Sequence, residues 1–144
     1  MAEIVAINIS EEKGVQKHEV PSAELRKNHG IVGDAHAGDW HRQVSLLADE
    51  SIEKMRKMGL DLDPGAFAEN IVTRGIILFE LPVGTRLQLG ETALGEVTQI
   101  GKKCHTGCAI AQTAGKCIMP TEGIFVKILE DGQIFPGDTI EVLP

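Results

Sequence analysis

The stretch TRLQLGETALGEVTQI, residues 85–100, is the clearest indication of the class of fold in this sequence. Polar and apolar side chains alternate over residues 85–89, which is typical of a strand with one buried face. Gly90 and Glu91 predict a two-residue turn with glycine first, and residues 92–100 predict the returning strand. The stretch therefore predicts an antiparallel β-hairpin.

Short runs rich in β-branched and other apolar residues recur along the rest of the chain, and each predicts a strand. These runs cover residues 3–9, 17–20, 44–47, 124–129 and 139–142. The second run is expected to pair with the first. Asp131 and Gly132 predict a hairpin turn after the fourth run, and Pro136 and Gly137 predict a turn before the last. Such strands favour a barrel or a sandwich, so the predicted fold is mainly β with a few short helices.

One helix is predicted clearly, over residues 49–58. Asp49 is a suitable N-cap, and Gly59 suits the left-handed conformation that often follows a helix. Ile52 and Met55 lie three residues apart, so the helix is expected to have one apolar face.

Length and composition are those of a single globular domain, residues 1–144, with 42% hydrophobic and 24% charged residues. No apolar run approaches the roughly 18 residues of a membrane span, and the N-terminus lacks the features of a signal peptide. We therefore expect a cytoplasmic protein that does not bind membranes. The net charge of −7 and the scarcity of aromatic residues argue against nucleic-acid binding.

A loop rich in Gly, Asp and His, GDAHAGDWHRQ at residues 33–43, is the first candidate site. Its glycines permit close approach of the backbone to a ligand. Such a loop could bind an anion through backbone N–H groups and Arg42, or a metal ion through His36 and His41. The same residues also fit a surface turn with solvated side chains, and the sequence leaves both interpretations open.

Cys104 is the second candidate, in the segment GKKCHTGC at residues 101–108. A thiol becomes reactive when neighbouring cations stabilise its thiolate. Lys102, Lys103 and His105 flank Cys104, so the segment predicts a reactive thiol.

Two further cysteines, Cys108 and Cys117, follow within a short distance of Cys104. They could form a resolving pair for Cys104, or be buried as small apolar side chains. Zinc binding by the three cysteines is a minor alternative, because their spacing differs from the usual pairs of zinc ligands.

The third candidate is the segment GAFAENI, residues 65–71. Glu69 supplies an acceptor, and Asn70 supplies both a donor and an acceptor. A pterin-like heterocycle would need both kinds of group. A capped turn is an equally good interpretation.

Seven segments, taken in order, resemble the family built on the molybdenum-cofactor sulfurase C-terminal (MOSC) domain, in its short, stand-alone form. They are GDAHAG (33–38), RQVS (42–45), PGAFAENI (64–71), LPVGT (81–85), TQIGKKCH (98–105), MPTEGIF (119–125) and PGD (136–138). The resemblance covers nearly the whole chain and implies a strand-rich domain, so the predicted fold is a MOSC-like β-barrel. The family pattern Phe-Gly-Glu-Asn differs at one position, where Ala68 replaces the glycine.

The resemblance implies binding of the molybdenum cofactor, a molybdopterin, and identifies Cys104 as the family's characteristic cysteine. In the family this cysteine carries sulfur as a persulfide or binds molybdenum as a thiolate. His105 is expected to act with it by tuning its pKa. The cofactor is expected to contact all three candidate segments, at Gly33, Asp34, His36, Gly38, Arg42, Glu69, Asn70 and Lys102.

The implied partners are a cysteine desulfurase that supplies sulfur, or a molybdoenzyme that receives the cofactor. Pyridoxal phosphate binding is associated with the family and is not expected from the residues of this chain. Two other functions stay open: a small oxidoreductase that reduces N-hydroxylated compounds at the molybdenum, and a module that binds molybdate or tungstate without a pterin.

Overall fold

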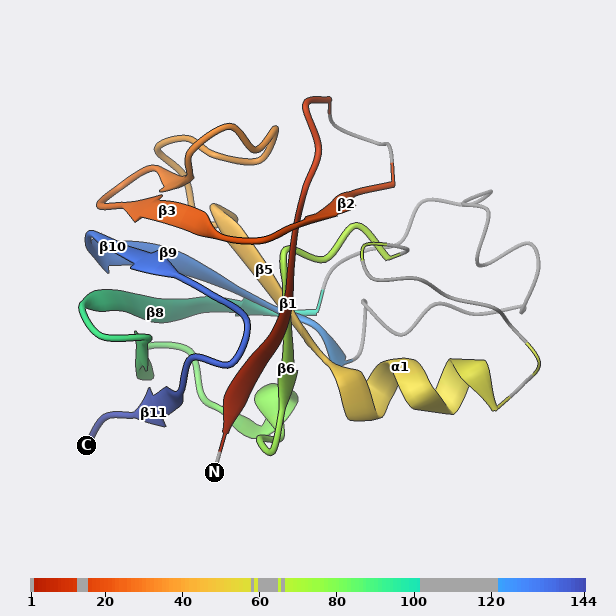
Figure 1. Ribbon diagram of the computed structural model, residues 1–144. Helices are drawn as coiled ribbons and strands as arrows, with labels where there is room; N and C mark the ends of the chain where they lie inside the picture. The colour runs from red at the N-terminus through yellow and green to blue at the C-terminus, as the bar shows by residue number, and fades with distance from the viewer. Residues whose placement is uncertain (1, 13–15, 58, 60–64, 66, 102–121) are drawn as a thin grey trace.

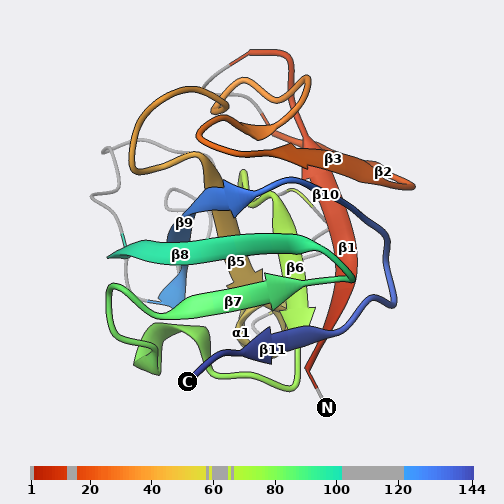
Figure 2. The same ribbon diagram turned by 90° about the vertical axis from the view of Figure 1, so that its left-hand side faces the viewer.

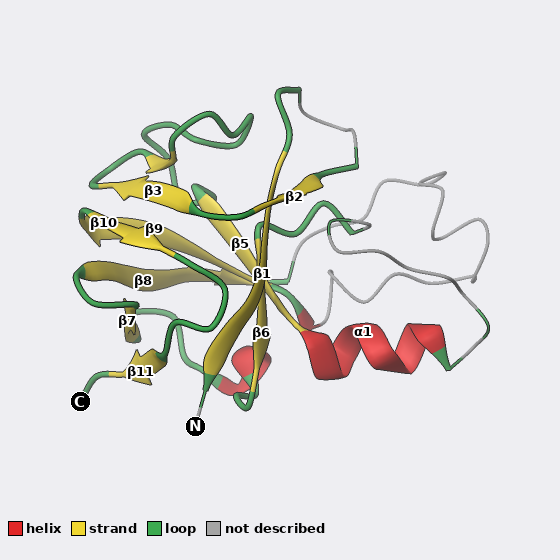
Figure 3. Cartoon of the chain, viewed as in Figure 1, coloured by secondary structure: helices red, strands yellow, loops and turns green. Residues whose placement is uncertain are grey.

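The computed structural model describes residues 2–12, 16–57, 59, 65, 67–101 and 122–144. Within these residues strands dominate, and the α-helix lies at one end of the molecule (Figure 3). The elements are β1 (Glu3–Ile9), β2 (His18–Val20), β3 (Ala23–Arg26), β4 (Gly30–Ile31), β5 (Val44–Ala48), α1 (Asp49–Arg56), β6 (Ile71–Arg74), the 3-10 helix η1 (Leu78–Glu80), β7 (Arg86–Leu89), β8 (Ala93–Ile100), β9 (Ile124–Glu130), β10 (Gly132–Ile134) and β11 (Ile140–Val142).

The strands form two sheets. The larger sheet has the order β11-β7-β8-β9-β5-β6-β1-β2, and the smaller has the order β10-β3-β4. Figure 1 and Figure 2 together show that the large sheet curls, with β7 and β8 crossing over β5 and β6. One pair, β5 with β6, is parallel, and α1 lies between these two strands in the chain. The fold therefore contains one β-α-β unit among otherwise antiparallel pairs.

The prediction of a mainly β fold is confirmed, but the strand ladders do not close into a barrel. The order of the large sheet is open, with β11 and β2 at its edges among the described strands. The start of β1 still contacts the chain just before β11, because an isolated bridge joins Glu3 to Thr139. The Ile4 N–H donates to the Asp138 carbonyl at 2.8 Å, beside this bridge. The curled sheet thus encloses a core without a continuous ring of strands.

Two apolar clusters hold the sheet and the helix together. The larger cluster fills the inside of the curl and includes Leu46, Leu87 and Val126. The smaller one lies between α1 and the sheet, where Ile52 and Met55 are both buried, as their spacing predicts. Because both faces of β5 are covered, all five of its residues are buried. This buried strand supplies the floor of the site described below.

The predicted hairpin over residues 85–100 is confirmed, although its turn is longer than predicted. Leu89 pairs with Ala93, so three residues connect β7 to β8. Gly90 has φ +70, a left-handed conformation that favours glycine. The other predicted strands are also present, and β2 pairs with β1 as expected.

The predicted hairpin at Asp131 and Gly132 is wrong, because β10 pairs with β3 in the smaller sheet. The Asp131 carboxylate accepts a hydrogen bond from the Lys27 N–H at 2.6 Å, which helps turn the chain away from β9. A Cβ on Gly132 would lie 2.5 Å from the Ala93 nitrogen. The glycine therefore permits a close crossing of two strands rather than a hairpin turn.

The N-cap of the helix lies one residue earlier in the chain than predicted. Ala48 is the N-cap and makes no side-chain capping bond, while Asp49 is the first helical residue. The Asp49 carboxylate instead pairs with Arg56 at 3.1 Å and Arg74 at 3.3 Å, which ties the helix to β6. Gly59 has φ +94, in agreement with its predicted place beyond the helix end.

Candidate functional site

A hollow opens between the loop that precedes β5 and the beginnings of β5, β6 and β9. Its lining residues are His36, Trp40, Arg42, Ser45, Ala68, Asn70 and Phe125. It is small and open, with a volume of about 100 Å³. Sites that enclose a whole small molecule commonly have volumes of about 300–1,000 Å³, so this hollow would contact one side of a ligand rather than enclose it. The structure therefore brings part of the first candidate segment, which carries His36 and Arg42, together with Asn70 from the third.

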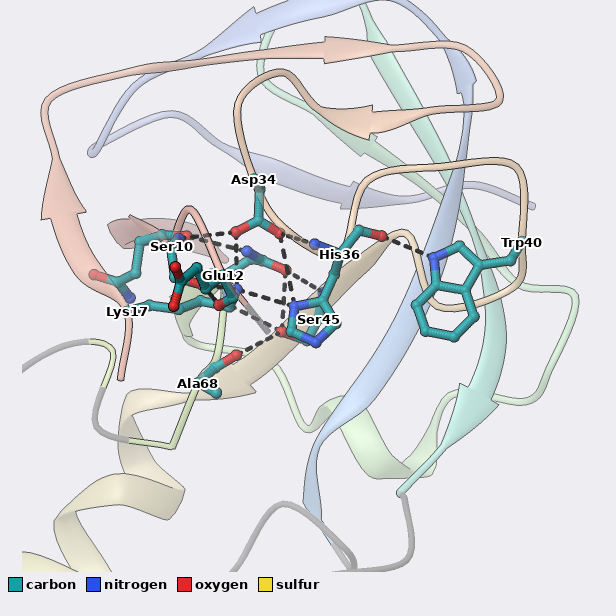
Figure 4. Close-up of polar contacts among 10 residues, drawn as sticks. Ser10, Glu12, Lys17, Asp34, His36, Trp40, Ser45 and Ala68 are labelled. Atoms are coloured by element: carbon teal, nitrogen blue, oxygen red, sulfur yellow. Dashed lines mark hydrogen bonds and ion pairs between the residues drawn. The ribbon is translucent and has the colours of Figure 1, made fainter. Parts of the chain in front are cut away.

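A buried ammonium group lies behind the hollow (Figure 4). The Lys17 Nζ donates to the Asp34 carboxylate at 2.8 Å and to the Ser10 hydroxyl at 3.1 Å. It also lies 3.1 Å from Nδ1 of His36. The side chains of Lys17 and Asp34 are both fully buried. Three partners thus satisfy the ammonium group, as burial of a charge requires.

This cluster determines the ionisation of Asp34. Burial alone would raise the pKa of Asp34, but the hydrogen bond and the charge of Lys17 outweigh burial and hold the pKa below its ordinary value. The Ser10 and His36 N–H groups also donate to this carboxylate, at 3.1 and 3.2 Å. Asp34 is therefore an anion at neutral pH and anchors the loop that carries His36.

The same cluster sets the hydrogen-bonding role of His36. An ammonium group can only donate, so Nδ1 of His36 accepts from Lys17 and carries no proton. A neutral His36 then carries its proton on Nε2. Because His36 lines the hollow, its ring offers a fixed tautomer to that side of the site.

Trp40 packs against His36 and completes this wall. Its indole N–H donates to the His36 carbonyl at 2.7 Å (Figure 4). The two rings are stacked, with centroids 6.5 Å apart and planes inclined by 7°. Together they present flat aromatic surface beside the hollow, which suits a planar ligand.

Arg42 supplies the positive charge that lines the hollow. Its guanidinium carbon lies 5.3 Å from the centroid of the Phe125 ring, and its Nε donates to the Gln99 side-chain oxygen at 3.1 Å. Within the described residues no carboxylate pairs with Arg42. A guanidinium in this state is a suitable receptor for a phosphate or another oxyanion.

Asn70 lies at the floor of the hollow, but its polar groups bind neighbouring strands. Its side-chain oxygen accepts from the Ser45 N–H at 2.9 Å, and its side-chain nitrogen donates to the Asn8 carbonyl at 3.1 Å. Asn70 therefore joins β1, β5 and β6. Its predicted contact with a heterocycle stays a prediction.

Glu69 does not line the hollow and is fully buried. Its carboxylate accepts the N–H groups of Gly65 at 2.9 Å and Phe67 at 3.0 Å, which is the capped turn that the sequence left as an alternative. Burial raises the pKa of Glu69, and the backbone N–H groups partly counteract that effect. Its side chain thus stabilises the turn that forms one rim of the site.

Two residues of this turn have left-handed backbone conformations. Gly65 has φ +91 and packs directly on the backbone of Lys17, which donates its N–H to the Gly65 carbonyl at 3.2 Å. Ala68 has φ +60, which is unusual for a residue with a Cβ. The glycine of the family pattern would adopt that conformation without strain, and alanine adopts it here at a cost.

The remaining predicted residues divide into two groups. Gly33 and Gly38 belong to the loop above the hollow and have φ +90 and +152, which favour glycine, and their contact with a ligand stays a prediction. Lys102, Cys104 and His105 lie outside the described residues, as do Cys108 and Cys117, so their roles stay predictions. In the described ranges, no three His, Cys, Asp or Glu side chains are grouped to hold a metal ion.

Several residues of the site were not predicted. Lys17 was expected only to begin a short strand, and lysine is seldom buried without a partner. Trp40, Ser45 and Phe125 occur in matched or candidate segments, but their types alone do not indicate a ligand. The nearest sequence signal for Lys17 is its position in a strand predicted to pair with β1, whose end carries Ser10.

Residues 33–141 match the MOSC domain family, which is three quarters of the chain. The chain belongs to the MOSC family. This family is associated with molybdenum-cofactor binding and with sulfurase-like function. No curated protein matches the chain.

Solved structures of MOSC-family proteins have the same fold. YuaD from Bacillus subtilis is 19% identical, with a TM-score of 0.79, and the match covers 99% of this chain and 96% of that one. YiiM from Geobacillus stearothermophilus is 20% identical, with a TM-score of 0.73, over 100% and 76% of the two chains. YiiM from Escherichia coli is 20% identical, with a TM-score of 0.68, over 100% and 70%. At these identities the likeness concerns the fold.

Among the described helices, none is long and apolar enough to cross a membrane.

Proposed function

We propose that this MOSC protein binds the molybdenum cofactor in the hollow lined by His36, Trp40 and Arg42, and that Cys104 carries sulfur for it or binds its metal. The observation that supports the proposal most is the Arg42 guanidinium, which lines the hollow without a carboxylate partner among the described residues. A cofactor that carries a phosphate and a flat heterocycle needs both a cation and an aromatic surface. The hollow supplies the two side by side.

The described residues fit the organic part of the cofactor. Arg42 would bind its phosphate, since guanidinium and phosphate form paired, charge-assisted hydrogen bonds. The aromatic wall of Trp40 and His36 would contact the pterin. The fixed tautomer of His36 gives the wall one defined hydrogen-bonding role. Lys17 and Asp34 act indirectly, by holding that imidazole in place.

The proposed role of Cys104 is supported by its place in the chain. Gln99 contacts Arg42, and the Gly101 N–H donates to the Gly123 carbonyl at 2.6 Å, so the end of β8 is fixed beside the hollow. Two residues separate Gly101 from Cys104 in the sequence, and a chain spans at most about 3.6 Å per residue. When bound, the cofactor would supply a molybdenum centre, which the thiolate of Cys104 would bind.

The experiment is purification from cells that make the cofactor, followed by three measurements on each variant. These are molybdenum per chain, fluorescence of the oxidised pterin, and an intact mass increased by one sulfur atom. Arg42→Gln is expected to lower molybdenum and pterin at least tenfold, by loss of a charged contact. Cys104→Ser is expected to lose the added sulfur.

Arg86→Gln is the matched control, since Arg86 is exposed on β7 and lies 3.7 Å from Glu96. It should retain wild-type contents. Wild-type protein with neither pterin nor molybdenum, and no persulfide, would contradict the proposal. Molybdenum without pterin would favour a molybdate-binding module, the second candidate that Arg42 supports. Zinc on the cysteines in place of molybdenum would overturn both.

A further inference from the structure

Gln99 contacts two side chains of the loop beside the hollow, those of Arg42 and His41. Its side-chain oxygen accepts from Nε of Arg42 at 3.1 Å and lies 3.1 Å from Nε2 of His41. Its side-chain nitrogen donates to the Gly101 carbonyl at 2.6 Å. The amide is therefore oriented by its own donor, with its oxygen turned toward Arg42 and His41. A rotated amide would lose the contacts with Arg42 and with the Gly101 carbonyl.

An irregularity in β8 aims this side chain. Val97 pairs with Val126, and Gln99 pairs with Phe125, so two residues of β8 face one step of β9. Successive side chains of a regular strand point to opposite faces. Here Thr98 and Gln99 both reach the same segment, since the Thr98 hydroxyl donates to the His41 carbonyl. Such bulges redirect side chains beside functional sites.

These contacts leave one edge of the Arg42 guanidinium for a ligand. The Phe125 ring covers one face, and Gln99 occupies Nε. No other described residue binds the two terminal nitrogens of Arg42. A guanidinium edge of this kind makes two parallel hydrogen bonds to a tetrahedral oxyanion.

We propose that Gln99 is a positioning residue, which the β8 bulge aims at Arg42 so that the terminal nitrogens of this arginine form a fixed receptor for a tetrahedral oxyanion. The oxyanion is either the phosphate of a larger ligand or a free anion such as molybdate. This inference rests on the proposed function, because it assigns the anion-binding part of the same hollow. It concerns Gln99, which does not itself line the hollow.

The test compares Gln99→Ala, Gln99→Glu and Arg42→Gln with wild-type protein. Gln88→Ala is the control, since Gln88 on β7 also donates to a backbone carbonyl, at 2.8 Å. Binding of molybdate and of inorganic phosphate is measured by calorimetry, and cofactor content is measured after purification. The NMR signal of the Arg42 Nε–H, identified by its loss in Arg42→Gln, reports positioning without any ligand.

Gln99→Ala is expected to weaken oxyanion binding about tenfold, as expected for loss of a hydrogen bond to a charged group, and to shift the Nε–H signal. Gln99→Glu is expected to keep that hydrogen bond but to weaken binding further than alanine does, because its carboxylate neutralises the guanidinium. Thermal unfolding of both should match that of Gln88→Ala. A general structural role of Gln99 would not make the glutamate variant bind the oxyanion more weakly than the alanine variant at equal stability.

The two sources of the anion separate in the same experiment. If Gln99→Ala and Arg42→Gln lose both free-oxyanion binding and cofactor content, a free anion and the ligand phosphate share the site. If these variants lose cofactor content alone, the oxyanion is the phosphate of a larger ligand. Wild-type binding and an unshifted Nε–H signal in Gln99→Ala would overturn the role of Gln99 and leave the proposed function intact. Unchanged cofactor content in Arg42→Gln, or wild-type protein that binds neither oxyanion nor cofactor, would overturn the proposed function and this inference with it.

Discussion

Gly65 is the position where one added methyl group tests how the site is built. A Cβ at Gly65 would lie 2.7 Å from the carbonyl carbon of Lys17, and closer still to its carbonyl oxygen. Both neighbouring groups are backbone, so no flexible side chain can move aside. Gly65→Ala must therefore displace either the Lys17 backbone or the turn that contains Gly65. The Glu69 carboxylate caps this turn by accepting a hydrogen bond from the Gly65 N–H at 2.9 Å.

The size of the effect follows from two contributions. A residue with a Cβ in the left-handed region costs about 1–2 kcal/mol relative to glycine. Relief of an overpacked contact by backbone movement costs about a further 1–3 kcal/mol. We expect Gly65→Ala to lower the free energy of unfolding by about 2–5 kcal/mol, which is a large share of the stability of a small domain.

The control is Gly84→Ala, at φ +98 with no atom within 4 Å of the added Cβ. It carries only the conformational contribution, about 1–2 kcal/mol. Urea unfolding of the three proteins is followed by circular dichroism and by fluorescence of the chain's one tryptophan. Because Trp40 stacks on His36, which contacts Lys17, Gly65→Ala should also change the native fluorescence. Equal losses of stability in the two variants, with unchanged fluorescence, would refute the reasoning.

Three further outcomes are expected. Lys17→Met should lower the free energy of unfolding by about 3–5 kcal/mol in urea, because it leaves the buried Asp34 carboxylate unpaired, and adding Asp34→Asn should restore part of the loss. Since the pKa of Asp34 is held below its ordinary value of about 3.9, its paired carboxylate stabilises the fold above that pH, and this contribution is lost as the pH falls through the lowered pKa. Urea midpoints between pH 7 and 2 should therefore fall more steeply at acid pH for wild-type protein than for Asp34→Asn. Ala68→Gly should raise stability by about 1 kcal/mol, by relieving the left-handed alanine at φ +60.

Each of these outcomes has a clear opposite. Additive losses in Lys17→Met and Asp34→Asn would show that the two side chains do not interact. Parallel pH profiles for wild-type protein and Asp34→Asn would show that the carboxylate titrates alike in the folded and unfolded chain. A destabilised Ala68→Gly would place that residue in an ordinary backbone conformation.

The parts of the fold that local patterns could predict are those determined by alternation and burial. The strands around residues 3–9 and 124–129 follow from their β-branched and apolar content, and the helix beginning at Asp49 follows from the spacing of its apolar residues. Both signals depend only on near neighbours. Pairing over longer distances was harder to predict. Gly132 has the composition of a hairpin turn, yet it serves a close crossing against Ala93, a residue almost forty positions earlier.

The candidate site shows the same division. The loop with His36 and Arg42 was predicted from its composition, and both residues line the hollow. Lys17 was not predicted, because its burial depends on Asp34 and His36, two partners that only the folded chain brings within 3.1 Å. Gln99 was not predicted as a site residue either, since a bulge in β8 decides where it points.

The most direct test of cofactor binding in the hollow is X-ray diffraction from crystals of protein purified from cofactor-producing cells, recorded at the molybdenum absorption edge. We predict an anomalous peak at the hollow, with pterin density beside Trp40 and phosphate density on Arg42. A hollow without ligand density, with the metal bound elsewhere or with zinc on the cysteines, would contradict it.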